Sequence, residues 1–559
     1  MYNLLIGGAA GQGIDTTVAI LEKLLKKSGY YVYTIRDFMS RVRGGHNFSA
    51  IRFGTEEITS HSDVYDGIIA LNAETVSLHK DKLTTHGFIL CDSSLMIDDP
   101  KAIKINIAEM TKKLGNSRVS GSIAIGAVLK LFGETLDYVD EVIRTSTREA
   151  FWEINQKAIS EGYDSVEKRF VHMDGNYHNE MLISGSKAVA LGAIAAGLRF
   201  YTAYPMSPST AVMEYLAAKS IETGIVVEQA EDEIAAINMA IGASYAGAKA
   251  MTGTSGGGFC LMVEALGFSG IAEIPLVVID VMRPGPATGL PTRTEQSDLK
   301  FVISAAQGEF PRMVIALRNH EDSFYQTIRA FHLAEKYQIP VILLSDQYLG
   351  DSTATVKPFA MPSYLPAEPT LTYTDDTEYL RYRFTENGIS PRLIPGKIDQ
   401  FVTADSDEHD ERGRITESAE MRIKMMDKRM NKLILLKEEL LEPEFIGDTN
   451  CTTLLLGWGS TYGPIKEAVS KLNELNENRY GALLFGDIYP LPTNRLTELS
   501  KQVTCIINIE QNATGQLAGL VREATGITCT SSVLKYDGRQ ISGEDIIHAL
   551  RKEDDYDTK

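Results

Sequence analysis

Arg283 comes just after the apolar run IPLVVIDV and opens the loop RPGPATGLPTRTEQSD, which is rich in proline and glycine. Parallel sheets bind ligands at the carboxyl ends of their strands, and a guanidinium there can hold a carboxylate through two parallel hydrogen bonds. The sequence therefore indicates a carboxylate clamp at Arg283. A surface arginine that pairs with Glu295 or Asp298 explains the same residues.

Three acids, Glu231, Asp232 and Glu233, stand between the strand-like run IVVEQ and the helix-like run EIAAINMAIGASYAG. Acids are common in a first helical turn because they complement the helix dipole. This helix, however, is so rich in small and apolar residues that we expect it to be buried. A carboxylate at its start then needs a polar partner.

The segment TAYPMSPST, residues 202–210, surrounds Ser207 with two prolines. Prolines fix the backbone and stiffen the loop, which suits a hydroxyl that positions a substrate. Alternatively, Ser207, Ser209 or Thr210 caps the helix that follows. Further on, three glycines after Ser255 in TGTSGGGF allow a backbone to approach a ligand closely.

The opening LLIGGAAGQG passes from a strand into a glycine-rich turn with Gly8, Gly11 and Gly13. A strand, a glycine loop and a helix start together suit a phosphate, although the spacing is GxxGxG and also fits a simple tight turn. The loop RVRGGHN carries Arg41, Arg43 and His46. It is either an anion-binding loop or a solvated basic surface loop.

The elements that position these residues predict an α/β protein of several domains. Residues 1–175 alternate apolar runs (NLLIGG, YVYTI, DGIIALN, GFILCD) with helices such as TTVAILEKLLKKSG, which predicts βαβ units on a parallel sheet. A polar connector at 161–180 precedes a second α/β region over 176–350. Residues 351–446 form a linker rich in proline and acids and then a helix, and 447–559 return to α/β. We expect that helix to pack through one apolar face made of Met426, Met430, Leu433, Leu436 and Leu440.

Length and charge limit the classes of function. The 559 residues suggest about three or four domains, and the formal charge of 55 − 74 = −19 argues against nucleic acid as a partner. The five cysteines form no CxxC pair, so the chain offers no zinc or iron–sulfur ligand set of its own. We expect no signal peptide, no membrane span and a cytoplasmic location.

The order of GGAAGQG, RGGHN, YPMSP, EDEIAAI, TSGGGF, RPGPATGLPT, GWGS and EQNATGQLA resembles the alpha subunit of 2-oxoacid:ferredoxin oxidoreductases in its fused gamma–alpha form. The resemblance covers nearly the whole chain. It implies a Rossmann-like gamma domain over 1–175, a pyrimidine-binding thiamine diphosphate domain over 176–350 and a transketolase-C-like domain over 447–559. The implied reaction converts a 2-oxoacid and coenzyme A to acyl-CoA, CO2 and reduced ferredoxin.

The same resemblance implies roles for individual residues. Arg283 would bind the substrate carboxylate with Ser207 and Thr292 beside it, although Ser207 replaces a threonine and Ala287 replaces a serine of the family motif. Glu233, with Glu231 as the second choice, would contact the aminopyrimidine of the cofactor. The remaining implied contacts are Tyr204 and Pro205 to the cofactor and Gly8, Gly11 and Gly13 to a coenzyme A-related group, with Ala10 where the family has glycine.

Thiamine diphosphate enzymes hold the diphosphate and Mg²⁺ with a GDG motif, and this sequence has none. The resemblance therefore implies a beta subunit that supplies this motif, Mg²⁺ and a 4Fe–4S cluster. 2-Oxoglutarate is the favoured substrate, with pyruvate and branched-chain 2-oxoacids as alternatives. A non-catalytic nucleotide-binding scaffold would leave YPMSP and RPGPATGLPT unexplained, and a transketolase-like enzyme would carry its own GDG.

Overall fold

The computed structural model describes residues 1–40, 45–363, 378–397, 399–474 and 479–557. Residues 1–184, 351–358 and 542–545 form one compact unit, here called unit 1, and residues 185–350, 359–541 and 546–559 form unit 2. Arg41 and Arg43, which the sequence singled out, lie outside the described residues. Each unit is described by itself.

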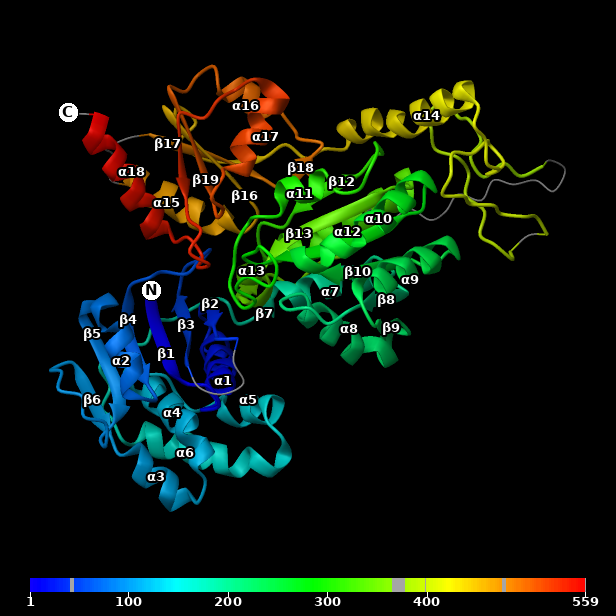
Figure 1. Cartoon of the computed structure of the whole chain (residues 1–559). Coiled ribbons are helices and arrows are strands. Elements are labelled where there is room, and N and C mark those ends of the chain that lie inside the picture. Colours follow the sequence, from blue (N-terminus) through cyan, green and yellow to red (C-terminus); the bar gives the residue numbers. More distant parts are fainter. Residues whose placement is uncertain (41–44, 364–377, 398, 475–478, 558–559) are drawn as a thin grey trace. The chain divides into compact units, whose positions relative to one another are not determined.

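Unit 1 is built on a mixed sheet with the strand order β6-β5-β4-β1-β3-β2-β14-β7 (Figure 1). The strands are β1 (Tyr2–Ala9), β2 (Tyr31–Asp37), β3 (His46–Gly54), β4 (Tyr65–Ala70), β5 (Leu83–Asp92), β6 (Ala102–Ile105), β7 (Met181–Ser184) and β14 (Thr353–Val356). The helices are α1 (Ile14–Lys27), α2 (Ala73–His79), α3 (Ile107–Leu114), α4 (Ser120–Phe132), α5 (Val139–Ser146) and α6 (Trp152–Tyr163), with short 3-10 turns η1 (Lys80–Lys82), η2 (Ser117–Val119) and η3 (Glu149–Phe151).

The parallel sheet expected for this region is present only in part. Strands β1, β4, β5 and β6 run parallel, whereas β3 runs antiparallel to both β1 and β2. The connection from Asp37 to His46 is short, and a parallel pair needs a crossover of about a dozen residues or more. The predicted helix in TTVAILEKLLKKSG is α1, whose buried face includes Val18, Leu21 and Leu25.

Unit 2 holds two further sheets, ordered β18-β12-β13-β11-β10-β8-β9 and β15-β17-β16-β19-β20. Its first half contains α7 (Gly185–Ala195), β8 (Phe200–Ala203), α8 (Thr210–Thr223), β9 (Val226–Gln229), α9 (Glu233–Tyr245), β10 (Ala250–Thr254), α10 (Gly256–Ile271), β11 (Leu276–Met282), α11 (Leu299–Ile303), β12 (Met313–Ala316), α12 (His320–Tyr337), β13 (Pro340–Asp346) and α13 (Gln347–Asp351). Its second half contains α14 (Ala419–Glu438), β15 (Glu444–Gly447), β16 (Thr453–Trp458), η4 (Gly459–Thr461), α15 (Tyr462–Glu474), β17 (Tyr480–Phe485), β18 (Asp487–Tyr489), α16 (Asn494–Leu499), β19 (Cys505–Glu510), α17 (Gln516–Thr525), β20 (Ser531–Leu534) and α18 (Gly543–Asp557).

The larger sheet of unit 2 positions the candidate site. Strands β9, β8, β10, β11, β13 and β12 run parallel, and β18 adds an antiparallel edge. Because neighbouring parallel strands end at the same edge, the loops after β8, β10 and β11 meet there. These loops are YPMSP, TSGGG and RPGPATG. The core beneath them joins apolar side chains of α9, α10 and β11, among them Ile237, Phe259 and Val278.

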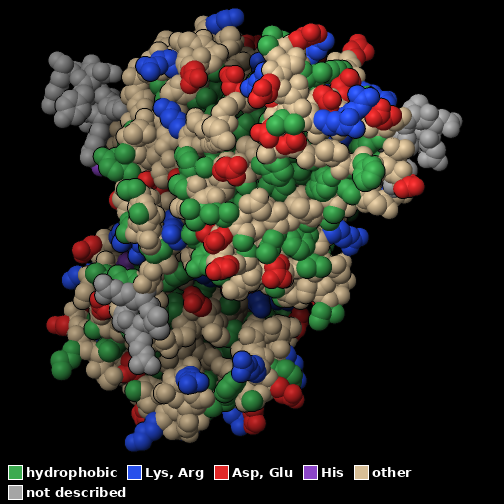
Figure 2. Space-filling model, turned by 45° about the vertical axis from the view of Figure 1, so that its right-hand side comes forward, with side chains coloured by type: hydrophobic (Ala, Val, Ile, Leu, Met, Phe, Trp, Pro, Cys, Tyr) green, Lys and Arg blue, Asp and Glu red, His purple; other side chains and the backbone are tan. Residues whose placement is uncertain are grey.

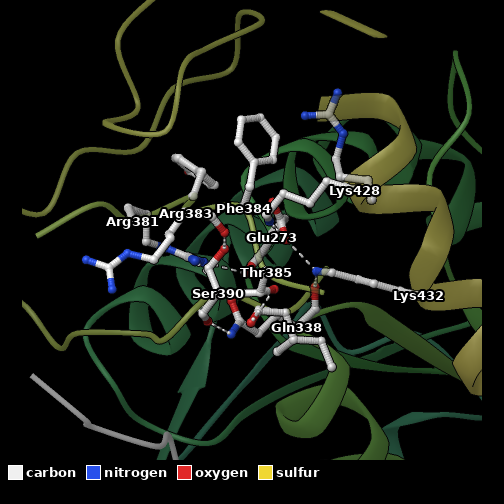
Figure 3. A network of polar contacts seen from close by, with 12 residues as sticks. Glu273, Gln338, Arg381, Arg383, Phe384, Thr385, Ser390, Lys428 and Lys432 are labelled. Carbon is white, nitrogen blue, oxygen red and sulfur yellow. Dashed lines mark hydrogen bonds and ion pairs between the residues drawn. The ribbon is translucent and has the colours of Figure 1, made fainter. Parts of the chain in front are cut away.

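Of the residues predicted to form the apolar face of the helix after residue 418, Leu436 is buried, and Met426, Met430, Leu433 and Leu440 are partly buried. The buried side of α14 carries Met425 and Leu436, but also the charged residues Lys428, Arg429 and Lys432. Lys428 Nζ donates to Glu273 Oε1 at 2.6 Å, and Lys432 Nζ donates to Glu273 Oε2 (Figure 3). The side chains of Glu273, Lys428 and Lys432 are almost completely buried. The helix is therefore attached to the rest of unit 2 by a buried ion cluster as well as by apolar contacts.

The surface agrees with the mixed charge of the sequence. Acidic and basic side chains are interspersed with hydrophobic ones on the face shown in Figure 2. Among the described residues, no helix has both the length and the apolar character needed to cross a membrane.

Candidate active site

Glu233 is the first residue of α9 and is buried, with 3% of its surface exposed. Its Oε1 has no hydrogen-bond partner among the described residues, and burial raises the pKa of its carboxyl group. Glu231 is exposed, and Asp232 caps the helix by accepting a hydrogen bond from Ala235 N at 2.7 Å. The capping explanation of the acids therefore applies to Asp232. Glu233 is left as a buried carboxylate with one oxygen, Oε1, that has no partner among the described residues.

The glycines of TSGGG make room for two carboxylates at the start of α10. A Cβ at Gly258 would lie 2.4 Å from Glu233 Oε1, and a Cβ at Gly256 would lie 2.4 Å from Asp298 Oδ2. Both distances are shorter than a van der Waals contact, so only glycine fits at either position without a shift. Gly257 between them is exposed and its side-chain position is almost open.

Arg283 lies at the carboxyl end of β11 and is half-buried. Its Nη1 donates a hydrogen bond to the carbonyl oxygen of Ser207 at 2.7 Å, whereas its buried Nε has no partner among the described residues. The structure records no ion pair of Arg283 with Glu295 or Asp298, so the surface-pair explanation is not supported. Burial lowers the pKa of the Arg283 guanidinium, and the negative charge of Asp298 partly offsets this decrease. The Ser207 carbonyl thus fixes Nη1 of the guanidinium, whereas Nε has no hydrogen-bond partner among the described residues.

The YPMSP loop follows β8 and touches Arg283 through its backbone. Ser207 is exposed, Tyr204 is 40% exposed, and Pro205 is partly buried. Ser209 occupies the N-cap position of α8 but its side chain makes no capping hydrogen bond. The capping role considered for this loop is therefore not seen at the helix start. Thr292 is partly buried in the loop after Arg283.

Two aspartates, the buried Asp280 and the partly buried Asp298, were not identified as site residues from the sequence. Asp280 lies within β11 and neither of its carboxylate oxygens has a partner among the described residues, and Asp298 Oδ2 is also unpartnered. Burial and the charge of Asp298 raise the pKa of Asp280 well above its ordinary value. Burial and the negative charge of Glu295 raise the pKa of Asp298 to about 6, and the positive charge of Arg283 partly offsets this increase. An acid inside the apolar run IPLVVIDV was the available sequence signal.

The glycine-rich loop lies in unit 1, at the end of β1. Gly11 (φ 92°) and Gly13 (φ 77°) adopt left-handed conformations, and Gly13 is the N-cap of α1. Gln12 closes the turn, because its Oε1 accepts a hydrogen bond from Ala9 N at 2.6 Å and occupies the space beside Gly8. The loop thus makes a tight turn and leaves Gly11 and Gly13 open on one side.

His46, from the RGGHN motif, is buried and does not act as a solvated basic residue. Its Nε2 lies 2.9 Å from Nε2 of His79, and the two rings are tilted against each other. Burial lowers the pKa of His46. This imidazole is therefore part of the packing beneath the glycine loop.

Comparison with known proteins identifies two family regions. Residues 191–428 match the model described as pyruvate flavodoxin/ferredoxin oxidoreductase, thiamine diP-bdg, and residues 3–165 match pyruvate ferredoxin/flavodoxin oxidoreductase. The 2-oxoacid:ferredoxin oxidoreductase subunit alpha of a Sulfolobus species is 34% identical, over 98% of this chain and 96% of its own length. The 2-oxoglutarate synthase subunit KorA of Archaeoglobus fulgidus is 32% identical over 66% of this chain and 99% of its own.

A solved structure matches along the whole chain. It is the 2-oxoglutarate:ferredoxin oxidoreductase from Magnetococcus marinus with 2-oxoglutarate, coenzyme A and succinyl-CoA bound. The TM-score is 0.92 with 30% identity, and the match covers 99% of each chain. The predicted α/β architecture and the resemblance read from the motifs are both confirmed by these comparisons.

Proposed function

The chain belongs to the 2-oxoacid:ferredoxin oxidoreductase family as an alpha subunit, and we propose that it oxidatively decarboxylates 2-oxoglutarate. Coenzyme A would take the acyl group, and ferredoxin would take the electrons. The relative from Archaeoglobus fulgidus is named for 2-oxoglutarate, and the solved relative contains it, which favours this substrate over pyruvate or a branched-chain 2-oxoacid. The observation that carries the proposal is the half-buried guanidinium of Arg283, whose Nε has no partner among the described residues, at the same sheet edge as the buried Oε1 of Glu233, which also has none.

Arg283 is proposed to bind the carboxylate that every 2-oxoacid carries next to its ketone. The Ser207 carbonyl holds one terminal nitrogen, and Nε on the other side of the guanidinium is buried and unsatisfied. A carboxylate that accepts from Nε and the second terminal nitrogen would satisfy the group with two parallel bonds. That geometry would fix the direction of the neighbouring ketone. The hydroxyls of Ser207 and Thr292 are proposed as further substrate contacts.

Glu233 is proposed to hold the aminopyrimidine of thiamine diphosphate, for which Tyr204 and Pro205 would form a wall. The residues fit this group, since Glu233 offers a buried oxygen that has no partner within the described chain. Burial raises the pKa of Glu233, which favours a carboxyl group that shares a proton with a ring nitrogen. Thiamine diphosphate, when bound, supplies the electron sink that the loss of CO2 requires.

A beta subunit is proposed to complete the site. The sequence has no GDG motif and no clustered cysteines, so we assign the diphosphate, Mg²⁺ and a 4Fe–4S cluster to that subunit. Apolar side chains are exposed on the two helices that begin at the site, Ile234 (50%) and Met239 (42%) of α9 and Leu261 (49%) of α10. Exposed apolar groups beside an incomplete polar site are typical of a protein interface.

Unit 1 is proposed to bind coenzyme A, with Gly11 and Gly13 open beside the start of α1, whereas the Gln12 side chain occupies the space beside Gly8.

We propose a division into a gamma domain at 1–175, a cofactor domain at 176–350, an extension at 351–446 and a C-terminal domain at 447–559. We also propose a cytoplasmic location, with no nucleic acid or membrane partner.

Reconstitution tests the function directly. The chain is purified with and without a beta subunit and supplied with thiamine diphosphate, Mg²⁺ and coenzyme A, and reduction of ferredoxin or viologen is followed with each 2-oxoacid. We expect turnover only in the complex, fastest with 2-oxoglutarate, and a colourless, inactive isolated chain. Turnover by the isolated chain would contradict the two-subunit site, and the absence of 2-oxoacid-dependent reduction in the complex would contradict the function.

A further inference from the structure

Two motifs of the C-terminal region, GWGS and EQNATGQLA, have no part in the proposed chemistry. GWGS lies at the end of β16, and EQNATGQLA runs from the end of β19 into α17. Strands β16 and β19 are parallel neighbours, so the two motifs meet at the carboxyl edge of the C-terminal sheet. The loop that follows Arg283 reaches this edge through Gln296.

Gln296 joins the loop to both motifs. It is completely buried, its Nε2 donates to the carbonyl oxygen of Trp458 at 2.7 Å, and its Oε1 accepts from Gln511 N at 3.1 Å. Its backbone adds two more bonds, because Gln296 N donates to the Gln511 carbonyl at 2.7 Å and Asn512 Nδ2 donates to the Gln296 carbonyl at 3.1 Å. This residue is thus held through both ends of its amide and through both polar groups of its backbone.

Glu510 fixes two of these partners. Its Oε2 accepts from Asn512 Nδ2 at 2.8 Å and from Trp458 Nε1 at 2.9 Å. Its Oε1 accepts from Asn508 Nδ2 and from Leu517 N, both at 2.8 Å. The carboxylate is fully buried, and hydrogen bonds satisfy both of its oxygens. A buried polar network that is satisfied in this way is rigid, so the partners of the loop are held in place.

A second contact holds the end of the same loop. Gln516 of α17 donates from Nε2 to the carbonyl oxygen of Ser297 at 2.7 Å, and its Oε1 accepts from Lys300 N at 2.8 Å. Thr294 N also donates to the carbonyl oxygen of Gly538 at 3.2 Å. This end of the loop is therefore bound along its length to the second half of unit 2.

The beginning of the loop is exposed and leads to Thr292, a proposed substrate contact that lies close to Gln296 in the sequence. Residues 285–290 are exposed, and within them Ala287 has a φ of 53°. This left-handed conformation is uncommon for alanine and persists only where the surrounding structure fixes it. The strand β11 fixes one end of the exposed segment, and the Gln296 contacts fix the other.

We propose that Gln296 is a positioning residue for the 2-oxoacid, which holds the loop between Arg283 and Thr292 in the conformation that receives the substrate. The inference rests on the proposed function, because Arg283 and Thr292 are substrate contacts there. The second half of unit 2 then takes part in substrate binding through GWGS and EQNATGQLA, although neither motif touches the substrate.

This role predicts a change in KM more than in kcat. A protein whose binding-competent state is populated for only a fraction of the time has an affinity reduced by that fraction, and saturating substrate restores the state. Gln296→Met keeps the length of the side chain and removes both of its hydrogen bonds. We expect KM for the 2-oxoacid to rise about tenfold and kcat to change less than about twofold.

Steady-state kinetics of the reconstituted complex with 2-oxoglutarate measure both constants. Gln338→Met is the matched control, because Gln338 is also buried and its amide also makes two hydrogen bonds, to the Ser390 carbonyl at 2.6 Å and from Arg381 Nη1 at 3.0 Å. These bonds hold the extension and not the loop. Both variants should lower the Tm of the chain, and only Gln296→Met should raise KM. An unchanged KM in Gln296→Met, or an equal rise in the control, would overturn the proposal.

The second contact of the loop provides a test even if Gln296→Met does not fold. Gln516→Met removes both hydrogen bonds of that side chain and should also raise KM for the 2-oxoacid. Gln516→Glu keeps the acceptor for Lys300 N and should restore part of the affinity. Wild-type KM in Gln516→Met would contradict the proposal.

Hydrogen exchange of the full chain gives a readout that does not depend on activity. The backbone amides of residues 294 and 296 are hydrogen-bonded to the C-terminal half, and we expect them to exchange about tenfold faster in Gln296→Met and at the wild-type rate in Gln338→Met. Unchanged exchange in Gln296→Met would overturn the proposal. If the wild-type complex has no 2-oxoacid activity, the proposed function fails, whereas the exchange rates still decide whether Gln296 holds the loop.

Discussion

Replacement of Arg283 should impair the use of every 2-oxoacid, because each substrate carries the carboxylate that this residue is proposed to bind. In Arg283→Ala, the guanidinium is lost together with its bond to the Ser207 carbonyl, and the bound carboxylate has no charged partner. Two charge-assisted hydrogen bonds of about 1.5–2.5 kcal/mol each predict a loss of about 3–5 kcal/mol in transition-state stabilisation. That loss corresponds to a decrease of about 10²–10⁴-fold in kcat/KM.

Arg283→Lys separates charge from geometry. Lysine retains the positive charge but cannot form two parallel bonds from one planar group. We therefore expect a loss of one bond, or about 10–100-fold in kcat/KM. The loss should be similar for pyruvate and 2-oxoglutarate, since the α-carboxylate is common to both.

Steady-state kinetics of the reconstituted complex measure both variants with each 2-oxoacid, and thermal unfolding confirms that they fold. Arg522→Ala is a matched control, because Arg522 is an exposed arginine of α17 in the same unit. A decrease below about threefold in Arg283→Ala would match the magnitude of a surface ion pair and would refute the clamp. A loss confined to one substrate would refute the assignment to the shared carboxylate.

Three further predictions test other buried charges. Glu233→Gln should leave the complex assembled and reduce turnover by about 10²–10⁴-fold, the usual contribution of a positioned proton transfer, whereas Glu231→Gln should be near wild type in the same assay. The pKa of Asp298 is raised from 3.8 to about 6 in the folded state. Between about pH 4 and 6 the folded state therefore binds more protons than the unfolded state, and the free energy of unfolding falls as pH rises through that window. Asp298→Asn should remove this pH dependence and stabilise the chain at pH 7 by about 1–3 kcal/mol. Denaturant unfolding at a series of pH values measures both effects. An unchanged pH dependence in the variant would contradict the assigned pKa. Glu273→Gln leaves two buried lysines of α14 without their carboxylate and should lower the free energy of unfolding by about 3–5 kcal/mol. The matched control Glu420→Gln removes an exposed ion pair of the same helix and should leave the free energy of unfolding almost unchanged.

Much of the fold could be predicted from local patterns. Apolar runs bounded by glycine, proline and polar residues indicated the strands β1, β2, β4, β5 and β11, and a small-residue run indicated α9. The direction of β3 was missed because apolar alternation does not distinguish parallel from antiparallel pairing. The short connection between β2 and β3 contained that information, since it cannot hold a crossover.

The buried face of α14 could not be predicted from its own sequence. Lys428 and Lys432 are spaced as an exposed charged face would be, and their partner Glu273 lies more than 150 residues earlier in the chain. Only the packing of α14 against the rest of unit 2 brings the three together. Local periodicity describes which residues share a face of a helix, but the long-range partner decides whether that face is buried.

The candidate site shows the opposite relation, because its residues break local rules in ways that the sequence already displays. Asp280 is an acid inside a buried apolar strand, Glu233 is a buried acid at a helix start that Asp232 already caps, and Gly256 and Gly258 occupy a helix where glycine costs stability. Each exception lowers stability by itself, yet all lie where β9, β10 and β11 end at one edge of the sheet. Natural sequences retain such costs mainly where a site requires them, so their coincidence identifies this edge more strongly than any single motif does.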